Sequence, residues 1–94
     1  MNYELEFKES ALKEWRKLDN SVRELLKKRL AEHLVAPRVE SAKLSGMPDC
    51  YKIKLRDAGY RLVYQVCYNL VSVTVIAVGK RENNQVYINA KERL

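Results

Sequence analysis

The chain opens with alternating apolar and polar residues, which is the pattern of a β-strand with one buried side. Over residues 2–8, the apolar Tyr3, Leu5 and Phe7 are separated by acidic residues, so that all three project to the same face. The second half of the chain holds another alternating run, a more apolar run, and a run rich in valine and threonine. Strands are therefore predicted at residues 2–8, 50–56, 61–67 and 70–78.

Between the first and second predicted strands, the apolar residues have the spacing of α-helices. This spacing predicts a short helix over residues 10–18 and a second helix from Ser21 to about Ala36, where the following proline disfavours further helix. Ser21 and Glu24 have the spacing of a capping box at the start of the second helix. A short terminal helix is expected from about Asn83.

These elements follow the order β-α-α-β-β-β-α, which predicts one α+β domain over residues 1–94. The two N-terminal helices are expected to pack on one face of a small four-stranded antiparallel sheet. Residues 37–49 contain two prolines and a glycine and are predicted to form a loop. Tyr68 and Asn69 are candidate turn residues before the last strand.

The second and third strands, taken as a hairpin, place several cations on one face of the sheet. If residues 57–60 form the connection, Arg56 pairs with Arg61, and every apolar residue of one strand meets an apolar residue of the other. A slip by one residue would put Lys54 opposite Leu62, which the hydrophobic pattern rejects. The predicted register leaves a group of cations together on the face away from the two helices, namely Lys52, Lys54, Arg56 and Arg61.

A cluster of like charges without an acid costs electrostatic repulsion and therefore needs an explanation. One explanation is a solvated edge on which lysine prevents aggregation, but a single lysine would serve that purpose. An anionic ligand would relieve the repulsion, and RNA is the natural candidate because cations hold its phosphates and aromatic rings stack on its bases. Tyr60, Lys80 and Arg81 lie close in sequence to these strands. Tyr87 could reach them too, although its spacing is more typical of a core or interface aromatic residue.

Composition narrows the class of protein without choosing a ligand. The 94 residues have a net charge of +6, and 47% of them are hydrophobic and 32% charged, which fits a globular domain. Residues 47–94 hold eight basic and four acidic residues, against ten and eight in residues 1–46, so the positive excess is concentrated in the second half. Such a surface favours nucleic acid, acidic protein segments or anionic membranes.

The cysteines and the histidine do not have the spacing of a metal site. Cys50 and Cys67 lie in apolar runs, so free thiols in a reducing cytosol are expected, with no metal and no cofactor. The single histidine, His33, lies in the predicted second helix and is expected at its surface rather than in catalysis. The acidic N-terminus does not resemble a signal peptide and no apolar run is long enough to cross a membrane, which predicts a cytoplasmic protein.

Four segments of the chain match a known sequence pattern. They are Ala-Leu-Lys-Glu-Trp-Arg-Lys-Leu at residues 11–18, Tyr-Lys-Ile-Lys-Leu-Arg at 51–56, Gly-Tyr-Arg-Leu-Val-Tyr at 59–64 and Val-Gly-Lys-Arg-Glu at 78–82. With these segments the chain resembles the RelE toxins of bacterial type II toxin–antitoxin systems over nearly its whole length. The resemblance implies the RelE/ParE, microbial-ribonuclease-like fold. It also implies a metal-independent endoribonuclease that cleaves mRNA in the ribosomal A site by attack of a 2′-hydroxyl group.

The resemblance further implies partners and roles for individual positions. The expected partners are mRNA on the ribosome with contacts to 16S rRNA, a RelB-like antitoxin, and operator DNA bound by the toxin–antitoxin complex. The implied catalytic set is Lys52, Lys54, Arg61, Arg81 and Tyr87, with further RNA-binding residues at Lys43, Arg56, Tyr60 and Lys80. Close relatives carry arginine where this chain has Ser45 and Asn83, so either weaker activity or a somewhat different grip on the RNA substrate is expected.

The chemistry of RNA cleavage refines these roles. A lysine must remove the proton of the 2′-hydroxyl group here, and at an unperturbed pKa of about 10.4 only about one lysine in a few thousand is neutral at pH 7. Because neighbouring positive charge lowers that pKa, Lys54 is predicted to be the base, with Lys52 lowering its pKa and holding phosphate. Arg61 and Arg81 are predicted to stabilise the transition state, and Tyr87 to orient the target base.

Two other functions stay open on the sequence. A ParE-like toxin that inhibits gyrase would share the fold but lack the full set of lysine, arginine and tyrosine residues. A non-catalytic RNA-binding module would keep the basic face without the chemistry. For inhibition by an antitoxin, displacement of the terminal helix near Tyr87 is one predicted route.

Overall fold

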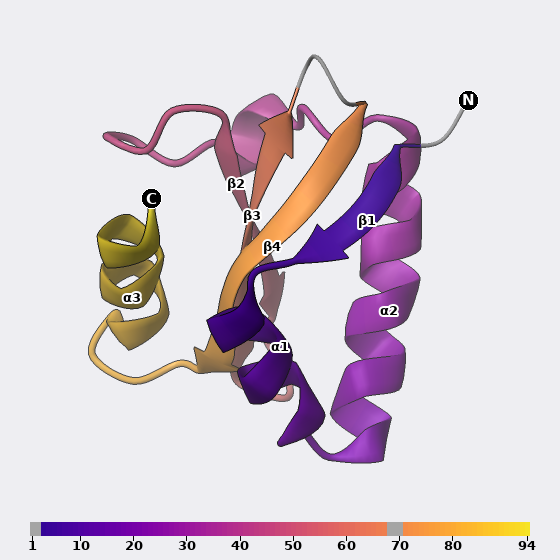
Figure 1. The fold of residues 1–94 in the computed structure, drawn as a ribbon. Helices are drawn as coiled ribbons and strands as arrows, with labels where there is room; N and C mark the ends of the chain where they lie inside the picture. Colours follow the sequence, from indigo (N-terminus) through magenta and orange to yellow (C-terminus); the bar gives the residue numbers. More distant parts are fainter. Residues whose placement is uncertain (1–2, 68–70) are drawn as a thin grey trace.

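The computed structural model describes residues 3–67 and 71–94, and in this part of the chain the elements follow the predicted order (Figure 1). They are β1 (Glu4–Phe7), α1 (Glu9–Arg16), α2 (Asn20–Val35), a 3-10 turn (Glu40–Ala42), β2 (Cys50–Leu55), β3 (Tyr60–Cys67), β4 (Ser72–Lys80) and α3 (Gln85–Arg93). The turn predicted at Tyr68 and Asn69 falls outside the described residues.

The strands of the described chain form one mixed sheet in the order β1-β4-β3-β2. β2 with β3 and β3 with β4 are antiparallel pairs, whereas β1 runs parallel to β4 and ends with Phe7 opposite Val75. The prediction of a purely antiparallel sheet is therefore wrong for β1. The sequence pattern could not decide this point, because apolar and polar residues alternate in the same way in parallel and antiparallel edge strands.

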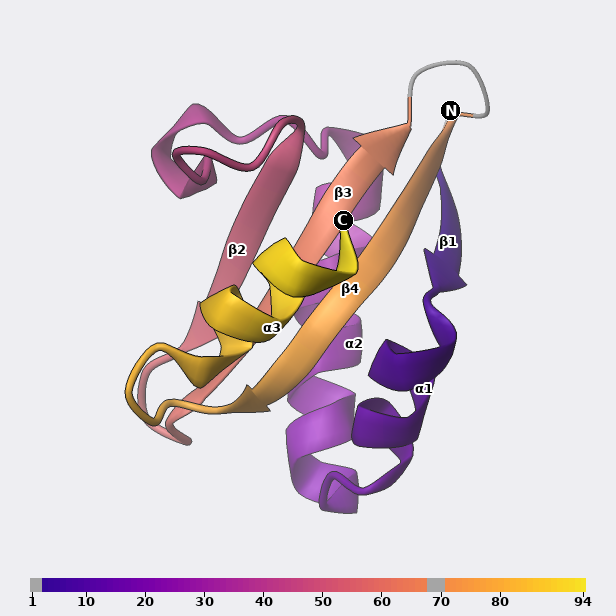
Figure 2. The same ribbon diagram turned by 60° about the vertical axis from the view of Figure 1, so that its left-hand side comes forward.

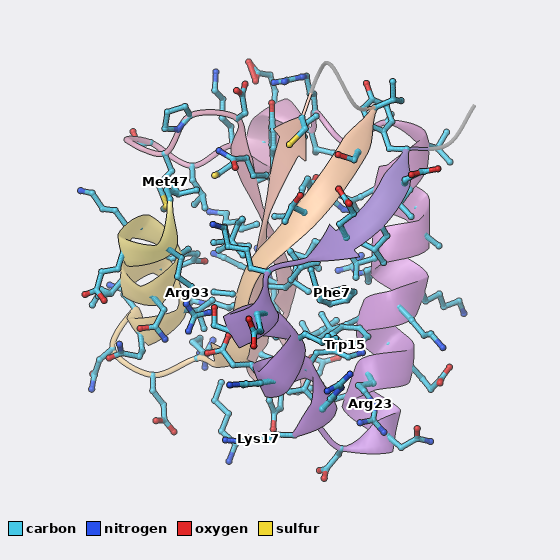
Figure 3. All side chains as sticks on the ribbon, viewed as in Figure 1. Phe7, Trp15, Lys17, Arg23, Met47 and Arg93 are labelled. Carbon is cyan, nitrogen blue, oxygen red and sulfur yellow. The ribbon has the colours of Figure 1, made fainter. Side chains whose placement is uncertain are left out.

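The two N-terminal helices cover one face of the sheet, as predicted, and α3 lies on the other face (Figure 2). The core on the side of α1 and α2 is continued at the β1 end by Phe7 and Trp15, whose ring centroids are 5.3 Å apart (Figure 3). This core buries Ala11 of α1, Leu18 of the connection between the two helices, and Val22, Leu26 and Leu30 of α2. These residues pack with Leu62, Tyr64, Val73 and Val75 of the sheet.

The basic face, which was expected to be free of helices, is partly covered by α3. Val86 and Ala90 of α3 belong to a second buried cluster with Val63 and Ala77 of the sheet. The chain turns back over the sheet after β4 through Asn83 and Asn84, which both have positive φ angles, a conformation that asparagine tolerates better than most residues. The basic surface is therefore narrower than the sequence predicted, and α3 forms one of its borders.

The β2–β3 hairpin keeps the predicted faces but not the predicted partners. Leu55 pairs with Tyr60 and Lys54 with Arg61, so the loop covers residues 56–59 and the predicted pairing of Arg56 with Arg61 is wrong. The error is a slip of two residues, which leaves every side chain on its predicted face because side chains alternate with a period of two. Gly59 closes the loop with a φ of 70° and donates its N–H to the Leu55 carbonyl oxygen at 2.8 Å.

Helix α2 begins one residue earlier than predicted and without the predicted cap. Asp19 is the N-cap residue and makes no side-chain capping bond. Ser21 therefore lies inside the first turn, and Glu24 approaches Lys27 at 4.0 Å across one helical turn. The capping-box prediction is wrong. Of the apolar stripe that predicted the helix, Val22, Leu26 and Leu30 are buried as expected, whereas Leu25 is exposed.

His33 has a structural role on the helix side of the sheet. The hydroxyl group of the buried Tyr64 donates to the Pro37 carbonyl oxygen at 2.6 Å and accepts from His33 Nδ1 at 2.7 Å. His33 is half-buried rather than on the surface, and burial, with the nearby Arg29 charge, lowers its pKa. Burial likewise raises the pKa of Tyr64, so this hydroxyl stays protonated at neutral pH.

Candidate active site and nucleic-acid interface

Three of the predicted site residues project from one face of the β2–β3 hairpin. Lys54 lies directly opposite Arg61, and Lys52 precedes Lys54 by two residues on the same strand, so the three side chains share a face. All three are partly exposed. This arrangement agrees with the face predicted from the sequence, and it sets two lysines against one guanidinium group on adjacent strands.

A pocket of about 250 Å³ lies at the loop end of this hairpin. None of the described residues that line it is acidic, so the charge of its lining favours an anion over a cation. Its lining consists of Lys54, Leu55, Arg56, Tyr60, Arg61 and Arg81. The structure therefore brings Arg81 to Lys54 and Arg61, which the sequence alone did not establish.

The pKa of Lys54 is lowered, chiefly by the positive charge of Lys52. Burial, the guanidinium groups of Arg61 and Arg56, and a hydrogen bond with Lys52 act in the same direction. Each neighbouring cation makes the ammonium form of Lys54 less favourable and leaves more of the free amine at neutral pH. The pKa shift has the direction that a lysine base requires, and its main cause is the residue that the sequence indicated.

Arg61 is held by two contacts with the segment that leads into α3. Its guanidinium carbon lies 5.2 Å from the centroid of the Tyr87 ring, and Nη1 donates to Asn84 Oδ1 at 3.5 Å. Arg61 Nε and the Tyr87 hydroxyl group are buried and have no hydrogen-bond partner among the described residues. Buried polar atoms without partners are uncommon in folded proteins, because each one carries a desolvation cost that no hydrogen bond offsets.

Arg81 is placed by its backbone rather than by its side chain. Its N–H donates to the Gly59 carbonyl oxygen at 2.7 Å, which ties the end of β4 to the hairpin loop. The side chain itself is exposed and reaches the pocket. A guanidinium group on a fixed backbone position can move toward a phosphate without any change in the fold.

The four predicted RNA-binding residues do not all lie on this face. Arg56 is exposed in the hairpin loop and lines the pocket with Tyr60. Lys80 lies opposite Tyr60, and Lys43 bridges Tyr51 at the edge of β2. Tyr51 and Tyr60 pack against the core on the α2 side, and paired residues project to the same side of a sheet. Lys43 and Lys80 are therefore separated from Lys52 and Lys54 by the sheet.

Two residues of the site were missed in the sequence. Asn84 contacts Arg61, and the Asn-Asn pair after β4 was a signal for a left-handed turn there. Arg29 of α2 donates from Nη2 to the Lys54 carbonyl oxygen at 3.3 Å and lines a groove of about 270 Å³ with Lys52, Lys54 and Arg56. No local pattern could identify Arg29, because its partner is distant in the sequence.

Metal ligands and membrane spans are not found in the described part of the chain. No group of three or more histidine, cysteine or acidic side chains in residues 3–67 and 71–94 could hold a metal ion. Cys50 and Cys67 are free thiols. The helices among these residues are too short or too polar to cross a bilayer.

Comparison with known proteins gives one consistent result. A family model described as the ParE toxin of the type II toxin–antitoxin system parDE matches residues 5–85. The mRNA interferase toxin RelE of Escherichia coli K12 is 63% identical over 94 residues, which is 100% of this chain and 99% of that protein. A putative RelE-like toxin protein of E. coli is 50% identical over the same length.

Solved structures agree with the sequence relatives. The free E. coli toxin RelE, in a form with two arginines changed to alanine, superposes with a TM-score of 0.92 at 62% identity and covers 100% of this chain and 99% of that chain. The toxin in the intact E. coli RelBE toxin–antitoxin complex superposes with a TM-score of 0.83 at 65% identity. This match covers 86% of this chain and 99% of that chain. The chain belongs to the family of type II toxins that includes ParE and RelE, and within that family to the RelE toxins.

Proposed function

We propose that the chain is an endoribonuclease toxin that cleaves mRNA in the ribosomal A site and so inhibits translation. The observation that carries this proposal is the 63% identity, over the full length of the chain, to the mRNA interferase toxin RelE of E. coli. The acid-free pocket of lysine and arginine side chains supports it, because such a pocket binds a phosphate and can stabilise its extra charge in the transition state.

Lys54 is the proposed base. RNA carries its own nucleophile, and the neutral amine of Lys54 would take the proton from the 2′-hydroxyl group as its oxygen attacks the adjacent phosphorus. The bond from phosphorus to the 5′-oxygen then breaks, which leaves a 2′,3′-cyclic phosphate and a 5′-hydroxyl end. Arg81 or a group of the ribosome would supply the proton that the leaving oxygen needs. The lowered pKa of Lys54 supports its role as the base, because every unit of depression gives roughly tenfold more free amine at neutral pH.

Arg61, Arg81 and Tyr87 would bind and stabilise the reacting phosphate and its base. Arg61 is already oriented by the Tyr87 ring and by Asn84, so little reorganisation is needed when negative charge develops on the phosphate. Arg81 would approach from the end of β4. Tyr87 would stack on or orient the target base, as aromatic residues do with unstacked RNA.

The ribosome is the proposed source of the remaining rate enhancement. Even with a lowered pKa, a lysine with an exposed ammonium group is a modest base, so the free protein should cleave RNA slowly. Fixing the mRNA in the A site would hold the 2′-hydroxyl group in position to attack the phosphorus. This orientation would supply the remaining rate enhancement. The exposed cations around the site would then contact 16S rRNA as well as mRNA.

Neutralisation by a RelB-like antitoxin is also proposed. RelE of E. coli has been solved in complex with its antitoxin RelB. The antitoxin of this chain would cover the basic pocket or displace α3, and the joint complex would bind operator DNA. The protein would act in the cytoplasm, where its ribosomal substrate is located.

Primer extension on mRNA tests the function directly. Purified toxin is added to a defined mRNA with and without ribosomes programmed with a chosen codon in the A site. Cuts at fixed positions within A-site codons, and only when ribosomes are present, are the expected result. Intact mRNA together with inhibited gyrase would establish the ParE-like function instead, and intact mRNA with stable RNA binding would establish a binding module.

A further inference from the structure

Helix α3 is attached to the sheet by few apolar contacts. Its buried residues are Val86 and Ala90, both small, and most of its other side chains are exposed. A helix of nine residues is not stable alone in water. The segment before it turns through the positive φ angles of Asn83 and Asn84, so α3 is not a straight continuation of β4. The position of α3 therefore depends on a further anchor.

That anchor is Arg93, at the C-terminal end of α3. Its Nη1 and Nη2 donate to Glu14 Oε1 and Oε2 of α1 at 2.8 and 3.1 Å, which is a two-pronged ion pair. Nη1 also donates to the Ile76 carbonyl oxygen of β4 at 3.0 Å. The side chains are only 22% and 28% exposed, so solvent screens the pair less than it screens a surface pair. Figure 3 shows Arg93 reaching from α3 toward α1.

Glu14 is itself fixed by the edge of the sheet. Its Oε1 accepts the N–H of Val78 at 3.2 Å, beyond the position where β1 stops pairing with β4 at Val75. Glu14 thus occupies a strand edge that β1 leaves open, and it presents its carboxylate to Arg93 from there. Three elements, α1, β4 and α3, meet at this one carboxylate, which we call the Glu14–Arg93 clasp.

The clasp holds the end of α3 opposite to the one that reaches the candidate site. Tyr87 lies six residues before Arg93, about 9 Å along the helix axis, and its ring packs on the guanidinium group of Arg61. A helix held at one end only can rotate and tilt, which would move the Tyr87 ring relative to Arg61. Holding both ends fixes this orientation.

We propose that Arg93 and Glu14 are positioning residues for RNA cleavage, acting through α3 on Tyr87 and Arg61. This proposal rests on the endonuclease function proposed above. The clasp contacts no RNA and takes no part in proton transfer. It keeps the Tyr87 ring where the target base must stack and keeps Arg61 oriented toward the phosphate.

Single-turnover cleavage on saturating programmed ribosomes tests the proposal. Arg93→Met removes the charge but keeps most of the side-chain length, and Lys91→Met is the matched control because it removes an exposed cation from the same helix. We expect Arg93→Met to slow the cleavage step about tenfold, as a small misplacement of a reacting group does, with ribosome affinity unchanged. Arg93→Lys should recover part of the rate, and Lys91→Met should leave it unchanged.

The same substitution in a second background separates positioning from general stability. When Arg93→Met is combined with Tyr87→Ala, no further loss of rate is expected, because the clasp acts through the residue already removed. An equal loss of rate in both backgrounds would overturn the proposal. A loss of ribosome affinity at an unchanged cleavage rate would also overturn it.

Hydrogen exchange in the free protein tests the clasp without any RNA. Arg93→Met should speed the exchange of α3 amide protons while those of β3 stay protected, and Glu14→Gln should have the same effect in weaker form. Unchanged exchange in α3, or faster exchange in α3 and β3 alike, would overturn the proposal. If the wild-type protein cuts no mRNA, the proposed function fails, and the exchange experiment still decides whether the clasp holds α3.

Discussion

The lowered pKa of Lys54 is a consequence of where Lys52 lies on β2. Residues two apart on a strand project to the same face, and Lys52 is the largest cause of the shift, ahead of Arg61 and Arg56. A lysine alone on this strand would be almost fully protonated at neutral pH. The short spacing between the two lysines therefore has a chemical effect that neither residue has by itself.

Replacing Lys52 should move the pH dependence of cleavage to higher pH. The active form of Lys54 is the neutral amine, so the rate rises with pH through the pKa of Lys54. Lys52→Met removes the main cause of the lowered pKa, which raises that pKa, shifts the rising limb to higher pH and lowers the rate at neutral pH. Arg56→Met should shift the limb less, because Arg56 is a smaller cause. Single-turnover cleavage rates on programmed ribosomes between pH 6 and 9 measure the shifts of both variants. A pH profile that Lys52→Met leaves unshifted would contradict the assignment of Lys54 as the base.

The unpaired hydroxyl group of Tyr87 predicts a conflict between stability and function. This oxygen is buried without a partner among the described residues, so Tyr87→Phe should stabilise the free protein, by about 1 kcal/mol. Urea unfolding followed by the fluorescence of Trp15 measures this change. Tyr60→Phe is the control, because the Tyr60 hydroxyl is not among the buried unpaired atoms. If the Tyr87 hydroxyl serves RNA, the stabilised variant should also cleave more slowly.

At the scale of elements, the hairpin loop decides which side chains meet across β2 and β3. The observed loop over residues 56–59 puts Lys54 opposite Arg61, whereas the predicted loop would have put Arg56 there. Both registers satisfy the hydrophobic pattern, because they differ by two residues. The choice between them depends on Gly59, which has a φ of 70° and ends the loop one residue earlier than expected.

Gly59→Ala should destabilise the protein through its backbone and not through a clash. A Cβ atom at Gly59 would meet nothing within 4 Å, but its positive φ is unfavourable for alanine, by about 1–2 kcal/mol. Gly79→Ala is the matched control, since Gly79 has no positive φ and its Cβ would make an ordinary contact with Val86 at 3.5 Å. Chemical unfolding of both variants measures the difference. Equal stability of the two variants would show that the loop conformation is not strained for alanine.

At the scale of the whole molecule, the sequence predicted the order of the elements and one face of the site. Periodicity identified each helix and strand, and the alternation in β2 and β3 placed Lys52, Lys54 and Arg61 together. It could not place α3, because Val86 and Ala90 form too short a stripe to indicate which face they cover. The parallel pairing of β1, the bond from Arg29 and the Glu14–Arg93 clasp were also out of reach, since each joins segments that are distant in the sequence.

The distribution of charge around the sheet predicts which cations meet RNA. Binding through phosphate contacts releases counterions from the RNA, and this release becomes less favourable as the salt concentration rises. Each contact therefore adds about 0.7–0.9 to the slope of log affinity against log salt concentration. Arg56 lines the pocket, whereas Lys43 projects from the other side of the sheet. When ribosome affinity is measured across a salt series, Arg56→Gln should therefore make this slope less steep by about the value of one phosphate contact. Lys43→Gln should leave the slope unchanged. Equal losses from both variants would mean that RNA follows the surface around the edge of β2, where Arg29 and Lys52 line a second groove.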